Sequence, residues 1–166
     1  MTKLPSVTVA QVLAWRPCPP YTRERIRELF GRKRRFTCDD FARLEIPIQD
    51  KLWCILHREL IPDKELTLLA CRYAKRTLGY ECKAGREPDE RSWNAIRVAR
   101  RFIAGEVSQA ELASAWAAAW AAARGAAWAA RAAKGAAAEA AAGASAYAAE
   151  IRWQFRAALK VARKTI

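Results

Sequence analysis

The fold class follows from residues 108–149, which read SQAELASAWAAAWAAARGAAWAARAAKGAAAEAAAGASAYAA. Alanine, the residue with the highest helix propensity, fills 24 of the 37 positions in 113–149, and no proline follows Gln109. Ser108 and Glu111 have the spacing of a capping box, which begins a helix. The stretch therefore predicts a long Ala-rich C-terminal helix or a helical hairpin.

The length of this helical stretch predicts a break. Fully helical, the 58 residues from Gln109 onward would extend about 87 Å, which is too long for a compact domain of this size. Gly143 offers a helix C-terminus and Ser145 a new N-cap, so the preferred break lies at Gly143-Ala144-Ser145. Gly125 and Gly135 are lesser candidates.

Capping signals and apolar periodicity predict helices in the rest of the chain. Short helices are expected after Thr8, Thr22 and Thr37, the second of them ending at Gly31. Longer helices are predicted over residues 48–60, 63–79 and 93–105. No run shows the alternation that a β-strand needs.

These features predict an all-α fold of about seven or eight helices in a single domain. Its parts would be the basic N-terminal helices in residues 1–44, a helical core in 45–108 and the Ala/Trp-rich segment in 109–166.

A helical projection places small residues and large or charged residues on opposite sides of the C-terminal segment. One side carries alanines such as Ala115 and, in the same phase, Ile151, Ala158 and Ala162. The other side collects Trp116, Trp120, Arg124, Trp128, Arg131, Lys134, Arg152, Trp153, Arg156, Lys160 and Arg163. In one interpretation the tryptophans anchor the core and the arginines reach past them to water. In the other, the Trp/Arg side is an exposed surface that binds a partner.

Basic residues concentrate in residues 21–36. The whole chain has 30 Lys and Arg against 17 Asp and Glu, a net charge of +13. Seven of the basic residues lie in 21–36, opposed only by Glu24 and Glu28, and four of them form the run Arg32-Lys33-Arg34-Arg35. Such a run is either a solvated loop or a contact for nucleic acid or an acidic protein. No zinc finger, helix-turn-helix or RNA-binding signature accompanies it, so sequence-specific DNA recognition is not expected.

The sequence predicts no catalytic residues, no metal site and no cofactor. Cys54 and His57 share a predicted helical face, but no third group is positioned by motif to orient them, so we interpret both as ordinary helix residues. Five cysteines without a CxxC pair favour a reducing, cytoplasmic location. Charges such as Arg124 and Glu139 interrupt the Ala-rich stretch, so we do not expect it to span a membrane.

Three stretches resemble a known family. They are Ile46-Pro47 leading to Asp50-Lys51-Leu52-Trp53 and Leu56, then residues 68–74 (LLACRYA), then residues 93–96 (WNAI) and 102–108 (FIAGEVS), ahead of Trp116 and Trp120. Over roughly residues 45–160 the chain is similar to the Ala/Trp-rich helical immunity proteins of bacteria and their phages. The resemblance implies a non-enzymatic protein that neutralises a partner, as a toxin antidote or as a phage inhibitor of a host defence complex such as an anti-CRISPR.

One departure from that pattern directs the partner prediction. Antidotes of nucleases are expected to be acidic, whereas this chain is strongly basic. We therefore expect its partner to be an acidic protein surface or a nucleoprotein complex, with non-specific nucleic-acid binding as the alternative function. The predicted contact residues are Arg32, Lys33, Arg34, Arg35, Trp116, Trp120, Arg124, Trp128, Arg131, Arg152, Arg156 and Lys160.

Overall fold

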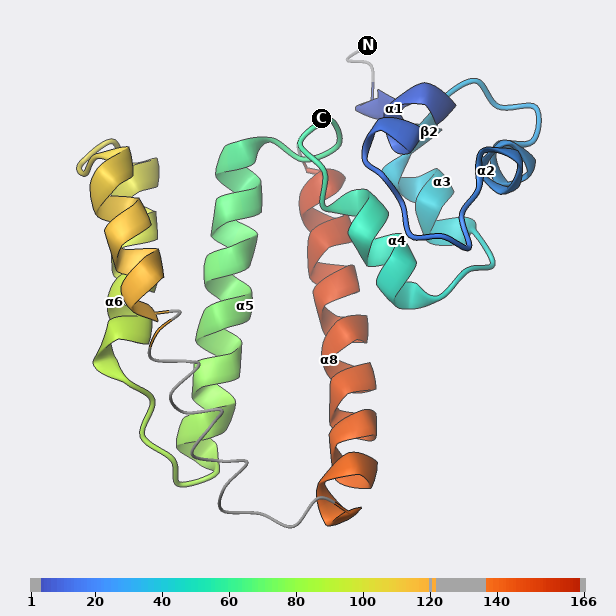
Figure 1. Ribbon diagram of the computed structural model, residues 1–166. Coiled ribbons are helices and arrows are strands. Elements are labelled where there is room, and N and C mark those ends of the chain that lie inside the picture. Colours follow the sequence, from blue (N-terminus) through green and yellow to red (C-terminus); the bar gives the residue numbers. More distant parts are fainter. Residues whose placement is uncertain (1–3, 120, 122–136, 165–166) are drawn as a thin grey trace. The chain divides into compact units, whose positions relative to one another are not determined.

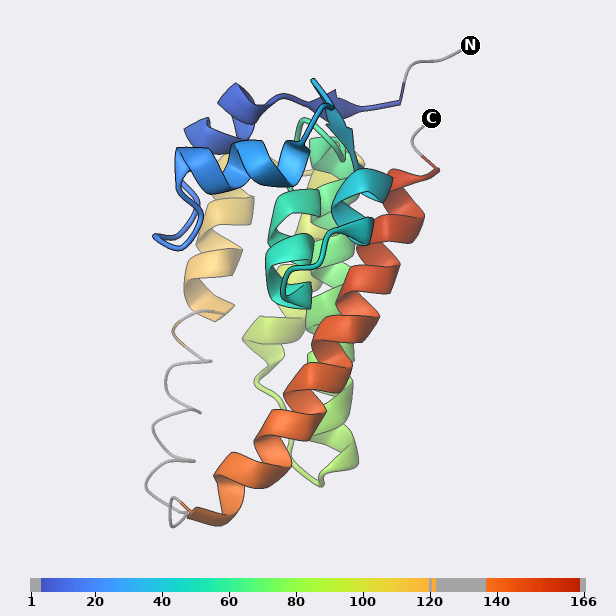
Figure 2. The same ribbon diagram turned by 90° about the vertical axis from the view of Figure 1, so that its right-hand side faces the viewer.

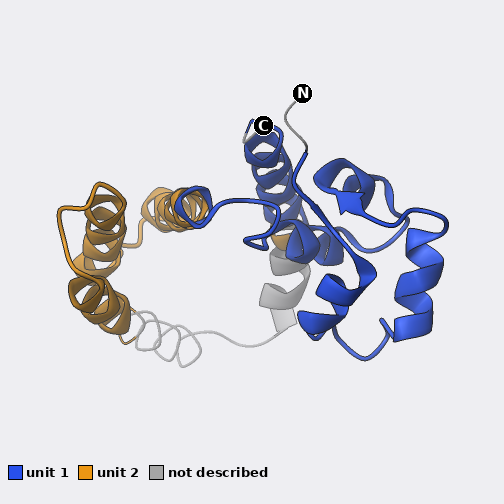
Figure 3. Ribbon diagram, turned by 90° about the horizontal axis from the view of Figure 1, so that it is seen from above, with its two compact units in different colours: residues 1–66, 148–166 blue, residues 67–147 orange. Residues whose placement is uncertain are grey.

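The computed structural model describes residues 4–119, 121 and 137–164, with side chains for all of these except 137–146. The chain divides into two compact units (Figure 3), residues Met1–Leu66 with Ala148–Ile166 (unit 1) and residues Thr67–Tyr147 (unit 2). The prediction of an all-α fold is confirmed (Figure 1). The described elements are β1 (Ser6–Val7), α1 (Val9–Ala14), α2 (Arg23–Phe30), β2 (Phe36–Thr37), α3 (Cys38–Arg43), α4 (Ile48–Ile55), α5 (Asp63–Lys83), α6 (Glu90–Ile103), a helix containing residues 109–119, and α8 (Ala137–Ala162). The prediction of a single domain stays a prediction.

The short helices of unit 1 begin where the sequence predicts. Thr8 and Thr37 each form a complete capping box, and the Thr22 hydroxyl accepts a hydrogen bond from the Arg25 backbone N–H. Gly31 ends α2 with φ +54°, a backbone conformation that glycine adopts without steric cost. The polypeptide is thereby turned away from α2 immediately before the basic run.

Two details of unit 1 differ from the prediction. The prediction of no strand is wrong, because Ser6–Val7 pairs antiparallel with Phe36–Thr37. Two-residue strands are too short to show alternation in the sequence. The helix predicted over residues 48–60 ends at Ile55, because Leu60 and Ile61 are buried in the following loop and donate their backbone N–H groups to the His57 carbonyl. In the sequence, the apolar side chain of Leu60 continues the helical spacing of residues 48–56, so the predicted helix was too long.

The core of unit 1 is built on three phenylalanines. Phe30 and Phe36 stack with ring centroids 3.9 Å apart, and Phe41 meets them edge-on at 6.3 and 5.4 Å. These rings join α2, β2 and α3. The C-terminal part of α8 lies beside α3, as the red and cyan ribbons show in Figures 1 and 2, and Arg163 there pairs with Asp39.

Unit 2 contains most of α5, together with α6 and the helix of residues 109–119. Its buried cluster consists of Cys71, Ile96, Ala99 and Leu112, with Leu78, Trp93, Val98 and Phe102 packed against it. The predicted capping box is present, because the Ser108 N–H donates to Glu111 Oε2 at 2.8 Å and the Glu111 N–H donates to Ser108 Oγ at 3.2 Å.

The sequence predicted two helix breaks at glycines where the helix continues. Helix α5 runs through Gly79 to Lys83 and ends only at Gly85, where φ is +73° and the Arg86 N–H donates to the Glu81 carbonyl at 3.0 Å. Helix α8 likewise continues through Gly143 and Ser145. One glycine costs a helix about 1 kcal/mol relative to alanine, which strong neighbouring helix formers can offset. Gly125 and Gly135, the other candidate breaks, lie outside the described residues.

This difference between Gly79 and Gly85 predicts opposite effects of the same substitution. Open space surrounds the Cβ position at both glycines. Gly79→Ala should therefore stabilise unit 2 by about 1 kcal/mol, which raises the Tm by roughly 2–4 °C. Gly85→Ala should cost about 1–2 kcal/mol, because an L-residue resists a positive φ. Thermal unfolding followed by circular dichroism measures both, and a lower Tm for Gly79→Ala would contradict the continuous α5.

Candidate functional site

The basic run forms an exposed loop between α2 and β2. Gly31 ends α2, and the Lys33 N–H donates to the Phe30 carbonyl at 3.0 Å, which closes a tight turn. Phe36 then returns to the core with only 4% of its surface exposed. Buried phenylalanines fix both ends of the loop, so the side chains between them point outward. Arg32, Lys33, Arg34 and Arg35 are all exposed.

Two of these four cations are held by the protein itself. Lys33 forms an ion pair with Asp40, and the Arg35 guanidinium donates from Nε to Ser6 Oγ at 2.8 Å and from Nη2 to the Ser6 carbonyl. Within the part of the chain that the structure describes, no ion pair involves Arg32 or Arg34. These two guanidinium groups therefore retain their full capacity to bind an anionic partner.

A second row of cations follows the exposed side of α8 in unit 1. Arg152, Arg156 and Lys160 are exposed and spaced four residues apart, which places them along one face of the helix. Ile151 and Ala158 are buried. In residues 151–164 the cations of the predicted stripe are thus exposed, and Ile151 and Ala158 of the opposite side are buried, whereas Trp153, predicted to lie with the cations, is half-buried.

The loop and the α8 row meet at the first turn of α3. Arg163 continues the row and pairs with Asp39 at 2.7 Å, and Lys33 of the loop pairs with the neighbouring Asp40. Burial of Asp40 raises its pKa, but the hydrogen bonds from Lys33 and Thr37 outweigh this and lower its pKa overall. We call the combined set the cationic surface, which comprises Arg32, Lys33, Arg34, Arg35, Arg152, Arg156, Lys160 and Arg163.

Two tryptophans of the predicted stripe are described, Trp116 and Trp153, and Trp153 is half-buried. Trp116 differs from it. This side chain is 48% exposed, whereas the adjacent Ala115 is buried, so the indole is not a core anchor. Trp116 belongs to unit 2 and borders an apolar hollow there. Trp120, Arg124, Trp128 and Arg131 lie outside the described residues.

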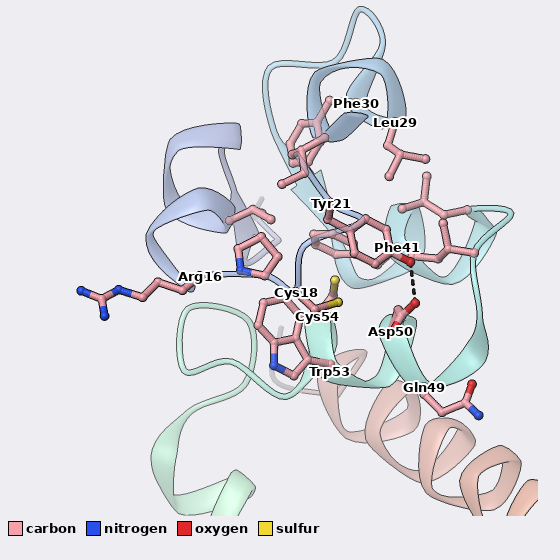
Figure 4. A pocket seen from close by; sticks show the side chains of 15 residues that line it. Arg16, Cys18, Tyr21, Leu29, Phe30, Phe41, Gln49, Asp50, Trp53 and Cys54 are labelled. Carbon is pink, nitrogen blue, oxygen red and sulfur yellow. Dashed lines mark hydrogen bonds between the residues drawn. The ribbon is translucent and has the colours of Figure 1, made fainter. Parts of the chain in front are cut away.

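The sequence did not predict a cavity of about 480 Å³ in unit 1 (Figure 4). Fifteen residues line it, among them the aromatic residues Tyr21, Phe30, Phe41 and Trp53. The Tyr21 hydroxyl donates to Asp50 Oδ2 at 2.5 Å. The sequence signal for this cavity was confined to the aromatic residues Tyr21, after the prolines at 17–20, and Trp53 in α4, and no spacing rule relates these two residues.

Cys54 lies in α4, whereas His57 follows the helix. His57 lies beyond the end of α4 and stacks on Trp15, with ring centroids 3.7 Å apart and planes at 4°. The prediction that both are helix residues is therefore wrong for His57. Burial lowers the pKa of His57, and burial together with Asp50 raises the pKa of the Cys54 thiol to about 12. A thiol that stays protonated at neutral pH is a poor nucleophile.

The described residues offer neither a candidate metal site nor a candidate membrane-spanning helix. The described part of the chain contains no group of three or more His, Cys, Asp and Glu side chains that could hold a metal ion. Within residues 4–119, 121 and 137–164, no helix combines the length and apolar composition that a membrane crossing needs.

Comparisons with known proteins return no match among protein-family models, curated proteins or solved structures. The resemblance to helical immunity proteins therefore stays a prediction, and the site must be interpreted from its own geometry.

The burial of the thiols predicts their reactivity. Cys18 and Cys82 are exposed, whereas Cys38, Cys54 and Cys71 are buried, and burial raises the pKa of each buried thiol. Iodoacetamide at about pH 8 should therefore alkylate Cys18 and Cys82 rapidly and the other three only after unfolding. Intact-mass and peptide mass spectrometry measure this. Rapid labelling of Cys54 in the folded protein would show that its thiol is accessible and activated.

Proposed function

We propose that this chain is a non-enzymatic binding protein that neutralises an acidic macromolecular partner through the cationic surface of unit 1. The observation that carries the proposal is the meeting of two cationic segments, the loop after α2 and the end of α8, at Asp39 and Asp40 of α3. Cations from distant parts of the sequence thereby form one surface, which attracts anions more strongly than either segment alone.

An acidic protein fits this surface better than a bare phosphate backbone does. Asp39 and Asp40 lie among the cations and occupy Arg163 and Lys33, which reduces the number of cations available to successive phosphates. Exposed charged groups belong to the polar rim of a protein interface, where charges select the partner and its orientation. Arg32 and Arg34 would then pair with carboxylates of the partner.

The proposed biological role rests on the resemblance of residues 45–160 to helical immunity proteins. On that basis the partner is a toxin, or a host defence complex inhibited by a phage protein in the manner of an anti-CRISPR. The four-residue spacing along α8 supports non-specific nucleic-acid binding as the second candidate, because Arg152, Arg156 and Lys160 could follow a phosphate backbone. Trp116, Trp120, Arg124, Trp128 and Arg131 remain predicted contacts.

Charge-removal variants test the proposal. The double variant Arg32→Ala/Arg34→Ala removes two cations that form no ion pair in the described residues, so its Tm should be unchanged. Capture of the partner from a lysate of the organism that encodes the chain should fall roughly tenfold or more, because two interfacial charge pairs are lost. Arg72→Ala/Lys75→Ala is the matched control, since it removes the same charge from exposed positions of α5 in unit 2. Equal capture by both variants would contradict a binding role for the loop.

Salt dependence separates the two candidate functions. A protein that contacts about four phosphates of duplex DNA should lose roughly 100-fold in affinity between 50 and 200 mM salt. The proposed protein interface has fewer charge contacts than a bound phosphate backbone, so its affinity should fall much less steeply over that range. A mobility-shift assay with single- and double-stranded nucleic acids makes the comparison. A shift with this salt dependence, combined with no captured protein, would favour nucleic-acid binding.

A further inference from the structure

The cavity of unit 1 has an aromatic lining and one acidic group. Four of its fifteen lining residues are aromatic, namely Tyr21, Phe30, Phe41 and Trp53. Its volume of about 480 Å³ lies within the range of small-molecule sites. Phe30 and Phe41 are buried, at 4% and 2% exposure, so Tyr21 and Trp53 are the aromatic rings with surface available to a compact organic group in this space.

Asp50 supplies the only negative charge of this lining. Its Oδ2 accepts the hydrogen bond from the Tyr21 hydroxyl, and no ion pair involves Asp50 within the described residues. Arg16 is the only basic lining residue, and its guanidinium group extends away from the cavity in Figure 4. The carboxylate thus has a hydrogen-bond donor but no counter-charge inside the cavity.

These observations select the charge of a ligand. An anion would meet the Asp50 carboxylate, and a neutral apolar group would cover it without supplying any compensating charge. A cation would satisfy the carboxylate and would also be attracted to the negative faces of the aromatic rings. A quaternary ammonium group suits the cavity best, because it has no N–H donors that would need acceptors in an apolar lining.

We propose that this cavity is a binding site for a quaternary ammonium group, with Asp50 as its counter-charge and Tyr21 and Trp53 as its aromatic walls. Trp53 lines the cavity and is 38% exposed, so its ring is accessible from solvent. Its ring is held edge-on against His57 and Trp15, with centroids 4.8 and 5.9 Å away. The hydrogen bond from Tyr21 fixes the Asp50 carboxylate, and burial together with Asp50 raises the pKa of Tyr21 well above its usual value, so the phenol remains a donor.

This site is independent of the cationic surface. The surface attracts anions, whereas the cavity would bind a cation, so a failure of one proposal leaves the other unaffected. The chain's positive charge opposes a cation at long range, and about 150 mM salt screens that repulsion beyond roughly 8 Å. Binding should therefore be measured at this salt concentration.

The first experiment titrates the full chain with choline and with 3,3-dimethyl-1-butanol, its neutral isostere, by calorimetry and tryptophan fluorescence. Choline should bind saturably and the isostere roughly tenfold or more weakly, because only choline gains the ionic and cation–π attraction. A peptide with trimethyl-lysine, compared with its unmethylated form, shows whether the source is a protein side chain or a free small molecule. Equal binding of choline and its isostere, or no binding of choline or of the trimethyl-lysine peptide, would overturn the proposal.

Variants then assign the binding to this cavity. Asp50→Asn should weaken choline binding roughly tenfold or more, since the amide keeps the size but loses the charge. Asp50 also lies in the first turn of α4, so Asp63→Asn in the first turn of α5 is the matched control and should bind choline as the unmodified chain does. Trp53→Leu keeps an apolar side chain at an exposed position and removes the π-face, so it tests the same site even if Asp50→Asn fails to fold. Unchanged affinity in Trp53→Leu and in folded Asp50→Asn would place the ligand elsewhere.

Discussion

The contact between Phe30, Phe36 and Phe41 is the constraint on which the organisation of unit 1 depends. Phe30 is the last residue of α2 and Phe36 belongs to β2, and their rings stack at 3.9 Å. This contact fixes both ends of the five-residue segment between them, so its four cations have no room in the core. Phe30 and Phe41 also line the cavity, so the same cluster positions the exposed loop and one wall of the cavity.

Local signals in the sequence were sufficient for the starts of the three short helices of unit 1 and for Gly31, which ends α2 with a positive φ. They were not sufficient for Gly85, since the sequence predicted the end of α5 at Gly79. Thr8, Thr22 and Thr37 each act within three residues of themselves, and no distant contact changes that chemistry. The errors arose where a local signal competed with tertiary burial or with the helix propensity of neighbouring residues. Leu60 continues an apolar periodicity but is buried from a loop, and Gly143 is a helix breaker only when its neighbours are weaker helix formers than alanine.

The features of the candidate sites that lie within one helix were predictable from the sequence, whereas those that need distant residues to meet were not. Periodicity predicted that the cations of α8 face outward, because this property belongs to one helix. The meeting of Arg163 with Asp39 joins residues 124 positions apart, and no spacing rule relates residues so far apart in sequence. The cavity likewise draws its lining from α1, α2, α3, α4 and the segments between them. Sequence patterns show that most of these residues are apolar or aromatic but do not show that they line a common space with Asp50.

Unit 1 combines a surface that favours anions with a cavity that favours a cation, and the range of electrostatic forces allows both. The surface charges act through water, where salt limits their reach to about 8 Å at physiological ionic strength. Asp50 acts over a few ångströms within a weakly polar cavity, where charge–charge attraction is several times stronger than in water. The net charge of the chain therefore governs which macromolecules approach it, whereas a single carboxylate can govern which small group enters the cavity.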